Sequence, residues 1–376
     1  MIWTLLNLML GRGLTMKRWN NFPRIEEVSH LDNLGFVIHV ALFLAYLEEK
    51  KWKKVDKLFL IKRLIFASFN RLVLADINSG TREYILSLDK EIFKELENKA
   101  LEKILELEWS DNIKEDIKNT LAEDSKTLEL LIIEAAKKYA GFRECTINSR
   151  VYSEVYEKTF NVIQQDLEKT RTKLDSLDEL LSNENYEKYL SHVRGLSHSF
   201  RWIQENRLFP VSVMAHLVYV TFISYVIWSI ENDNWAELDI EELLLKSIYH
   251  DIPEAITGDI ITPTKRAIPG FVEILEEVEL KMMEDYMFEY VPEDYKNHIS
   301  PYIFAPFDDE IWKIAKYSDI FSALFEAKIE INNWNLAFKD MYLSIKNKAN
   351  SFGLTSTDYL VKYWIDKFDE DKKLFV

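Results

Sequence analysis

The longest apolar runs of the chain predict helices that are buried on all sides. In "HVALFLAYLEE" (residues 39–49) and "HLVYVTFISYVIWSI" (216–230), apolar side chains occur all round the helical turn. The segment "FVEILEEVELKMMEDYMFEYV" (271–291) is amphipathic instead. Its apolar stripe consists of Phe271, Ile274, Leu275, Val278 and Met282. Because no strand-turn-strand pattern stands out, the sequence predicts an all-α fold.

Five short motifs occur twice in the chain, in the same order. In the second half they are "FRW" (200–202), "VMAHLVYV" (213–220), "LLLKSIYHD" (243–251), "GDIITPT" (258–264) and "IAKYSDIF" (314–321). Their counterparts in the first half are "KRW" (17–19), "EVSHLDNL" (27–34), "LIKRLIFASFN" (60–70), "ADINSGT" (75–81) and "AAKKYAGF" (135–142). The offset in residue number is similar for every motif, which predicts two tandem copies of one helical domain packed as a pseudo-dimer.

The repeat sets the expected domain boundaries. We place the first copy at residues 16–190 and the second copy at residues 191–376. Residues 1–15 begin with ten mostly apolar residues, which are too few to span a bilayer and follow no basic stretch as in a signal peptide. We expect this segment to be a non-functional extension or a short packing segment.

Composition and charge narrow the possible partners. Hydrophobic residues make up 48% of the chain, enough for a substantial core in each half, and 9 Gly with 8 Pro favour helices over turn-rich sheets. The net charge of −16 argues against a broad nucleic-acid surface, although a small nucleotide needs only a local cation. Cys145 is the only cysteine, so there is no intrachain disulfide and no cysteine-rich zinc site. A reducing, cytoplasmic location is expected.

Four polar residues interrupt apolar helices of the second copy. His216 lies in the second of the buried runs, His250 and Asp251 end another helix, and Asp319 lies in a third. Singly, each has an ordinary alternative as a hydrogen-bonded core histidine or a carboxylate that pairs two helices. Ligation of one metal ion would satisfy all four together, and two imidazoles with two carboxylates suit Mn, Fe, Co, Ni, Zn or Mg. We therefore expect one divalent metal ion per chain.

These residues resemble the signature of a known family. The ligand set has the order H…HD…D, which is similar to that of the HD-domain metal-dependent phosphohydrolases. The pair Arg201-Trp202, with His216 after it and then "YHDIPEAITGDIITPTK" (249–265), resembles more narrowly the bacterial 5'-deoxynucleotidase branch. The resemblance covers about residues 195–330. It implies an all-α fold and hydrolysis of nucleoside 5'-monophosphates to nucleoside and phosphate with a divalent cation.

Two further carboxylates in the same string are candidate catalytic groups. Glu254 follows His250 by four residues and Asp251 by three, so a continuous helix would place them on one face, although Pro253 favours a kink. With four ligands already assigned, we expect Glu254 to be a general base or to orient water, and the resemblance implies the same. The resemblance makes Asp259 a second carboxylate near the phosphate, able to activate water or to protonate the leaving 5' oxygen.

Other residues of the string and its flank are candidates for substrate binding. Arg201 and Lys265 could neutralise the phosphoryl oxygens, and a guanidinium can hold phosphate with two hydrogen bonds. Thr262 belongs to the same Thr-Pro-x-Lys tail, and the face of Trp202 could exclude a 2'-hydroxyl. The alternatives are a solvated lysine after a turn and a tryptophan of the core. Ala215 departs from the family, which often has glutamate there, so help from that position is absent.

The first copy is predicted to have lost this site. In the order H, H, D, E and D, the motif alignment gives His30, Phe69, Asn70, Val73, and Gly141 or its neighbour Ala140. Three of the four ligand positions cannot bind a hard cation. Arg18 and Trp19 remain, which leaves a residual anion pocket open. Since the family commonly forms dimers, a fused pair with one inactive member would have one active site per chain.

The leading hypothesis is a metal-dependent 5'-nucleotidase that acts on deoxynucleoside monophosphates. Its partner would be a small-molecule nucleotide, with no nucleic acid and no membrane, and the chain would be a monomer acting as an internal pseudo-dimer, or a homodimer. One alternative is a hydrolase of the same superfamily that acts on nucleoside triphosphates, cyclic dinucleotides or other phosphate esters. Another is a nucleotide-sensing protein without catalysis, against which the intact ligand set counts.

Overall fold

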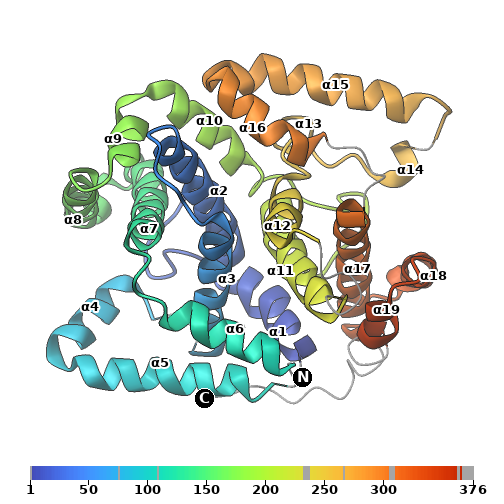
Figure 1. Cartoon of the computed structure of the whole chain (residues 1–376), viewed down its shortest axis with the longest axis horizontal. Helices are drawn as coiled ribbons and strands as arrows, with labels where there is room; N and C mark the ends of the chain where they lie inside the picture. Colours follow the sequence, from blue (N-terminus) through green and yellow to red (C-terminus); the bar gives the residue numbers. More distant parts are fainter. Residues whose placement is uncertain are drawn as a thin grey trace.

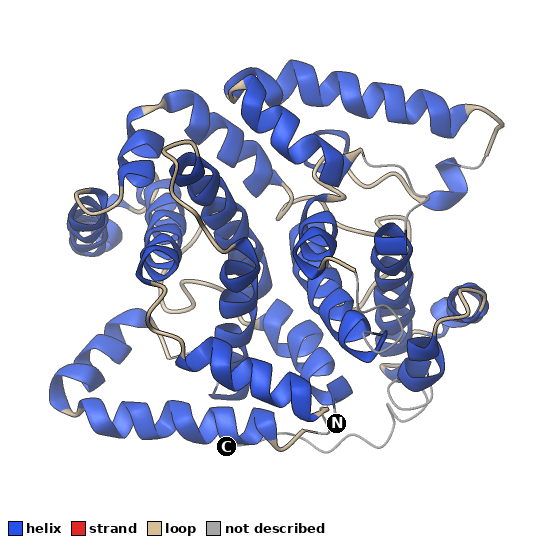
Figure 2. Ribbon diagram, in the orientation of Figure 1, coloured by secondary structure: helices blue, strands red, loops and turns tan. Residues whose placement is uncertain are grey.

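The computed structural model of the chain describes residues 2–74, 77–107, 110–231, 238–265, 267–304, 310–361 and 365. Within these residues the regular secondary structure is helical (Figure 2). Their β-type pairing is limited to two isolated antiparallel bridges, Lys17–Ser29 and Phe200–Ser212. The prediction of an all-α fold is confirmed.

The first half of the chain runs from α1 to α10. Its helices are α1 (Ile2–Leu8), the π-helix η1 (Met9–Gly13), α2 (His30–Glu49), α3 (Lys57–Leu74), α4 (Ser79–Leu88), α5 (Lys90–Leu105), α6 (Asp111–Ala122), α7 (Thr127–Ser149), α8 (Ser153–Arg171), α9 (Asp175–Ser182) and α10 (Glu184–Gly195). The boundary expected at residue 190 therefore falls within α10, which connects the two halves.

The second half runs from α11 to α19. Its helices are α11 (Val213–Glu231), α12 (Ile240–Tyr249), α13 (Glu254–Thr257), α14 (Thr262–Lys265), α15 (Phe271–Tyr286), the 3-10 helix η2 (Phe288–Tyr290), α16 (Glu293–Ile303), α17 (Glu310–Asn332), the 3-10 helix η3 (Leu336–Phe338), α18 (Lys339–Asn350) and α19 (Thr355–Leu360). The predicted site residues lie in α11, α13, α14 and α17 and in the segments that precede α11 and follow α12 and α13.

The two predicted apolar helices form the centre of the molecule. Helix α2 packs against α11, with α7 beside α2 and α17 beside α11 (Figure 1). By length and composition alone, α2 and α11 could each cross a membrane, but 94% and 83% of their apolar windows are buried inside the protein. They are core helices here, as their all-round apolar pattern predicts.

Equivalent backbone hydrogen bonds occur in the two halves, and their residue numbers differ by a constant offset of 183, as in Arg201 and Arg18. The matched pairs are Lys17–Ser29 with Phe200–Ser212, Arg18–Val28 with Arg201–Val211, and Asp56–Leu60 with Asp239–Leu243. The backbone of Trp19 (φ 57°) and that of Trp202 (φ 59°) share a left-handed conformation that is unusual for a bulky residue. The structure thus repeats in detail at the start of each copy.

Gly35 of α2 lies in close contact with α11. A Cβ atom added there would lie 2.6 Å from Sδ of Met214 and 3.0 Å from Cγ2 of Val218. Both distances are shorter than ordinary van der Waals contact. The absence of a side chain at residue 35 therefore permits the contact between the two copies.

We expect Gly35→Val to lower the free energy of unfolding by about 1–3 kcal/mol, the usual cost of overpacking a core. Thermal or denaturant unfolding measures this change. Gly141→Ala in α7 is the control, because a Cβ atom there would meet nothing within 4 Å. Alanine in an open helical position should be neutral or stabilising by up to about 1 kcal/mol. Equal stability of the wild type and Gly35→Val would contradict the close helix contact.

The amphipathic segment after residue 270 forms α15, but its apolar stripe is only partly buried. Leu275 is 7% exposed, whereas Ile274 is 55% and Val278 is 41% exposed. Helix α15 packs on α13, α14 and η2 at one edge of the molecule (Figure 1). These short elements cover only part of the stripe.

The N-terminal segment is packed against the first copy. Leu5, Leu6 and Met9 are fully buried, and Nη1 of Arg12 donates to the backbone carbonyl of Leu72 in α3 at 2.8 Å. Of the two expectations for residues 1–15, this arrangement matches a short packing segment.

Candidate metal centre

Four predicted ligands from three helical regions converge in the second copy. His216 lies in the first turn of α11, His250 and Asp251 follow directly after α12, and Asp319 lies within α17. Ligand atoms of His216, His250 and Asp251 lie within 4.8 Å of one another. Oδ1 of Asp319 lies 3.3 Å from Nε2 of His216. The structure therefore brings together all four residues that the sequence assigned to one metal ion.

Both histidine rings present an unused nitrogen to this point. Nδ1 of His250 donates to the backbone carbonyl of Ser247 at 2.9 Å. The hydroxyl of Ser322 donates to the carbonyl of Asp319 at 2.7 Å, so it accepts from Nδ1 of His216 at 3.3 Å. Each Nε2 is buried and has no hydrogen-bond partner. A buried nitrogen without a partner is costly, and an imidazole protonated on Nδ1 is the form that ligates a metal through Nε2.

The spacing of the ligand atoms fits a shared ion. Oδ2 of Asp251 lies 3.3 Å from Nε2 of His250 and 3.6 Å from Nε2 of His216. Two atoms that each bind one ion at roughly 2.1 Å and at a right angle are about 3 Å apart. The donor set and its unpartnered nitrogens thus fit one divalent cation.

Neighbouring charges keep the two carboxylates of the set ionised. Burial raises the pKa of Asp251, but the interactions of its carboxylate with His250 and His216 together hold that pKa below its usual value. Burial acts in the same way on Asp319, and Lys316, with Nζ 3.0 Å from Oδ2, lowers the pKa of that carboxyl well below its usual value. Ionised carboxylates are the form that binds a cation.

Arg201 lies against the same carboxylates. Its Nη1 is 3.7 Å from Oδ2 of Asp251 and its Nη2 is 3.8 Å from Oδ1 of Asp319. Its Nε is 3.8 Å from Oε1 of Glu326 and has no hydrogen-bond partner. Burial opposes the charge, but Glu326, Asp319 and Asp251 raise the pKa of the guanidinium. An anion that reached the metal position would meet this fixed positive charge.

The two candidate catalytic carboxylates lie on opposite sides of a glycine turn. Glu254 begins α13, is only 8% exposed, and has one carboxylate oxygen without a partner. Burial, followed by the charges of Asp251 and Asp259, raises its pKa well above the usual value. Gly258 ends the helix at φ 71°, a conformation that favours glycine. Oδ2 of Asp259 then accepts from the backbone N–H of Trp202 at 3.1 Å.

The structure describes the surroundings of Trp202 and Lys265, two of the predicted substrate-binding residues. The ring of Trp202 stacks on Phe338 at 5.5 Å and lies below the guanidinium of Arg207, 5.7 Å away. Lys265 ends α14, and its charge acts on Glu254. The side chain of Thr262 lies outside the described part of the structure.

Several contacting residues were missed by the sequence analysis, among them Ser322 beside His216 and Arg207 beside Trp202. Glu326 faces Arg201, Lys316 pairs with Asp319, and Phe338 supports Trp202. Glu326 follows Asp319 by seven residues, two helical turns, so helical spacing could have revealed it. Phe338 comes from a separate helix, and no local pattern connects it to Trp202.

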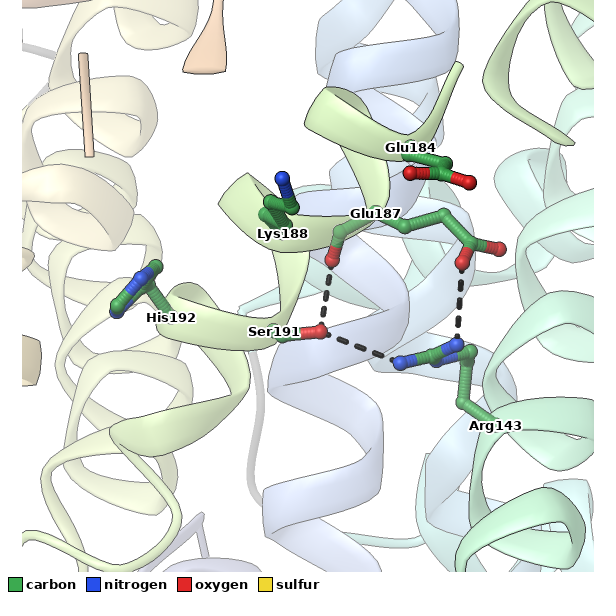
Figure 3. A pocket seen from close by; sticks show the side chains of 6 residues that line it. All are labelled: Arg143, Glu184, Glu187, Lys188, Ser191 and His192. Atoms are coloured by element: carbon green, nitrogen blue, oxygen red, sulfur yellow. Dashed lines mark hydrogen bonds and ion pairs between the residues drawn. The ribbon is translucent and has the colours of Figure 1, made fainter. Parts of the chain in front are cut away.

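A hollow of about 370 Å³ between α7 and α10 does not belong to this centre. It is lined by Arg143, Glu184, Glu187, Lys188, Ser191 and His192 (Figure 3). Arg143 donates to Glu187 at 3.3 Å and to Ser191 at 3.2 Å. Arg143, Glu187 and Ser191 thus bond to one another, and none of the predicted site residues lines the hollow.

The structure corrects the alignment of the first copy. The matched hydrogen bonds keep the offset at 183 up to α3, so His30 is not the counterpart of His216. The side chain of Asn148 accepts a hydrogen bond from the backbone N–H of Ile25, and that of Glu330 accepts the equivalent bond from Leu208, both at 2.9 Å. Since Glu330 and Asn148 differ by 182 in residue number, the offset is 182 in α7. In the order H, H, D, E and D, continuing these offsets along the chain gives Asn33, Ala67, Ser68, Arg71 and Lys137 as counterparts. These five positions hold no histidine and no carboxylate.

Comparison with known proteins agrees with a repeated domain. The sequence matches the family described as 5'-deoxynucleotidase YfbR-like twice, over residues 8–182 and 188–368. A 5'-deoxynucleotidase from Vibrio atlanticus is 21% identical over 183 residues, which are 48% of this chain and 94% of the relative. The 5'-deoxynucleotidase YfbR of Salmonella arizonae is 25% identical over 187 residues, 48% of this chain and 91% of the relative.

A solved structure is similar over half the chain. It is an HD-domain phosphohydrolase from Listeria innocua with 24% sequence identity and a TM-score of 0.45. The similarity covers 50% of this chain and 91% of that protein. The two 5'-deoxynucleotidases, which match 48% of this chain over most of their own length, thus correspond to about one of the two copies.

Proposed function

The chain belongs to the YfbR-like 5'-deoxynucleotidase family, and from this premise we propose that its second copy hydrolyses deoxynucleoside 5'-monophosphates to nucleoside and phosphate. The observation that carries the proposal is the convergence of His216, His250, Asp251 and Asp319, with two buried Nε2 atoms that have no partner. One divalent ion per chain, of Mn, Co, Mg, Fe, Ni or Zn, would be held by these four residues. A bound divalent ion lowers the pKa of its water and polarises a phosphoryl oxygen.

The remaining residues have distinct proposed tasks. Arg201 holds the phosphoryl oxygens, since its guanidinium already lies beside two of the ligand carboxylates. Glu254 takes the proton of the attacking water as its oxygen bonds to phosphorus. The bond to the 5' oxygen breaks, and Asp259 supplies the proton to that leaving oxygen. Lys265 and Thr262 complete the phosphate contacts of the Thr-Pro-x-Lys tail.

Trp202 is proposed to read the sugar. Its backbone bonds to Asp259, and its ring is fixed between Phe338 and Arg207. A rigid aromatic face next to the leaving oxygen would leave no room for a 2'-hydroxyl. The substrate is then a free deoxynucleotide in the cytoplasm. The chain that handles it is a monomer acting as an internal pseudo-dimer, or a homodimer, with no nucleic-acid or membrane partner.

Phosphate release from a panel of ribo- and deoxynucleoside 5'-monophosphates, with each candidate metal in turn, tests the proposal. We expect release from deoxynucleotides to exceed release from the matching ribonucleotides. If none of these monophosphates is cleaved with any metal, the proposed substrate class is wrong. Nucleotide binding without turnover would then favour the sensing role.

Glu254→Gln is expected to lower kcat by roughly 10²–10⁴-fold with little change in KM, because it removes a proton acceptor and keeps the shape. The pKa of Glu254 is higher in the folded protein than in the unfolded chain. The metal-free protein therefore loses stability as the pH rises above the pKa that Glu254 has in the unfolded chain. Glutamine has no such cost. The metal-free variant should therefore have a higher Tm than metal-free wild type at pH 8, by a margin that shrinks as the pH falls.

Glu273→Gln serves as the control, since Glu273 is exposed on α15. It should change neither kcat nor the pH dependence of Tm. An unchanged kcat in Glu254→Gln would remove Glu254 from the proposed mechanism.

A further inference from the structure

The first copy carries positive charge where the second copy carries carboxylates. Continued along the chain, the matched offsets of 183 and 182 give Arg71 as the counterpart of Glu254 and Lys137 as the counterpart of Asp319. The charge at each position thus changes from −1 to +1. Loss of a metal site by drift needs only neutral replacements. Two cations at these places form the opposite kind of site.

The cations of the first copy lie around one buried ring. His30 is 6% exposed and neither of its ring nitrogens has a hydrogen-bond partner. Burial, followed by the charges of Arg71, Arg18 and Lys137, lowers its pKa to about 3, with the backbone of Ser68 acting in the opposite direction. The imidazole is therefore neutral and adds no charge of its own to the three cations.

Lys137 is reachable by a small molecule. Its side chain is exposed on α7, and desolvation by the protein around its ammonium is the largest cause that lowers its pKa to about 8. The charges of Arg71, Arg63 and Arg82 lower it further. Mutual repulsion of this kind is relieved when an anion binds among the cations.

The first copy also has an arginine, Arg18, in the backbone position of Arg201, the proposed phosphate-binding residue of the second copy. Arg18 occupies the position of Arg201 with the same backbone bond, and Glu144 accepts from its Nε and Nη2 at 3.1 Å. The same Glu144 oxygen accepts from Nε1 of Trp19 at 2.9 Å. Arg18 and Trp19 are thus fixed in place beside the cations.

We propose that the first copy is a metal-free anion site, which binds a phosphate group between Arg71, Lys137, Arg18 and the buried His30. The ligand is either a nucleoside monophosphate or free orthophosphate, since both present the same oxygens to guanidinium and ammonium groups. The inference rests on the residues of the first copy and not on catalysis by the second. It gives the chain two different phosphate sites, one that has metal ligands and one that has cations.

Calorimetric titration of chelator-treated protein with orthophosphate, dAMP and deoxyadenosine tests this site. An Arg201→Ala background removes the phosphate contact of the second copy. There we expect orthophosphate and dAMP to bind with one site per chain, and deoxyadenosine not to bind. Tighter binding of dAMP than of orthophosphate would identify a nucleotide as the ligand, and equal binding would identify phosphate.

Lys137→Asp in the same background is expected to weaken binding by at least about tenfold, since it replaces a charge-assisted contact by repulsion. Lys137→Arg should retain binding. Lys138→Asp is the matched control, because Lys138 is directed to Glu134 and Thr170 instead. Circular dichroism confirms that each variant is folded. Absence of binding in the Arg201→Ala background, or equal binding by Lys137→Asp and Lys138→Asp, would overturn the proposal.

Discussion

Asp251→Ala is expected to reduce phosphate release from deoxynucleoside monophosphates by more than about 100-fold. Loss of an outer residue that only orients a ligand already costs roughly 10–100-fold, and Asp251 is a proposed ligand itself. Its Oδ2 lies near both ligand histidines and near Arg201. Alanine would remove the atom shared by these contacts, and it would leave Arg201 with one anionic partner fewer. Steady-state kinetics with saturating metal measure the effect.

Ser68→Ala is the matched control, because Ser68 occupies the position of Asp251 in the first copy. Its hydroxyl bonds only to the carbonyl of Ile65 in the described structure, at 2.6 Å. We expect turnover by this variant to equal that of wild type. Full activity of Asp251→Ala would place the active site elsewhere.

Removal of metal is expected to abolish turnover and to lower thermal stability. Without a cation, the unpartnered Nε2 atoms of His216 and His250 stay buried. The carboxylates of Asp251 and Asp319 then share the charge of Arg201, with Lys316 beside Asp319. An ion present at 100 times its Kd stabilises a protein by about 2.7 kcal/mol. Re-addition of a divalent cation should therefore restore activity and raise Tm by a few degrees.

The Asp251→Ala variant provides the comparison for this experiment. Its Tm should respond much less to added metal than that of wild type, because one of the four ligands is missing. A chelator that left turnover intact would contradict a metal-dependent mechanism, and an equal Tm response in both proteins would place the ion at another site.

The sequence was sufficient for the fold class and the repeat, and it selected the four candidate ligands that the structure brings together. His250, Asp251, Glu254 and Asp259 lie within one short string whose spacing is itself a motif. His216 and Asp319 could be selected because a polar residue in an apolar helix is costly without a partner. These signals are local, and local signals are what a single sequence carries.

The alignment of the first copy could not be obtained in this way. The similarity of His30 to His216 in "EVSHLDNL" and "VMAHLVYV" suggested an offset of 186, whereas the backbone hydrogen bonds give 183. The offset then changes to 182 before α7. For this reason the sequence alone did not identify Lys137 as the counterpart of Asp319. Only the structure shows which residues of the two copies are equivalent. It thereby shows that cations of the first copy correspond to carboxylates of the second.

Contacts between distant segments were also beyond the sequence. Phe338 supports Trp202 from η3, and the exposure of Ile274 and Val278 depends on how little of α15 the neighbouring elements cover. An amphipathic pattern predicts a helix and an apolar face, but it does not say what packs on that face.

The most direct test is a titration of metal-free protein with Mn²⁺ in which phosphate release from dAMP is followed. The account predicts that activity rises linearly and reaches its plateau at one equivalent of metal per chain, because only the second copy has the ligand set. A plateau at two equivalents, or no release at any ratio of metal to protein, would contradict it.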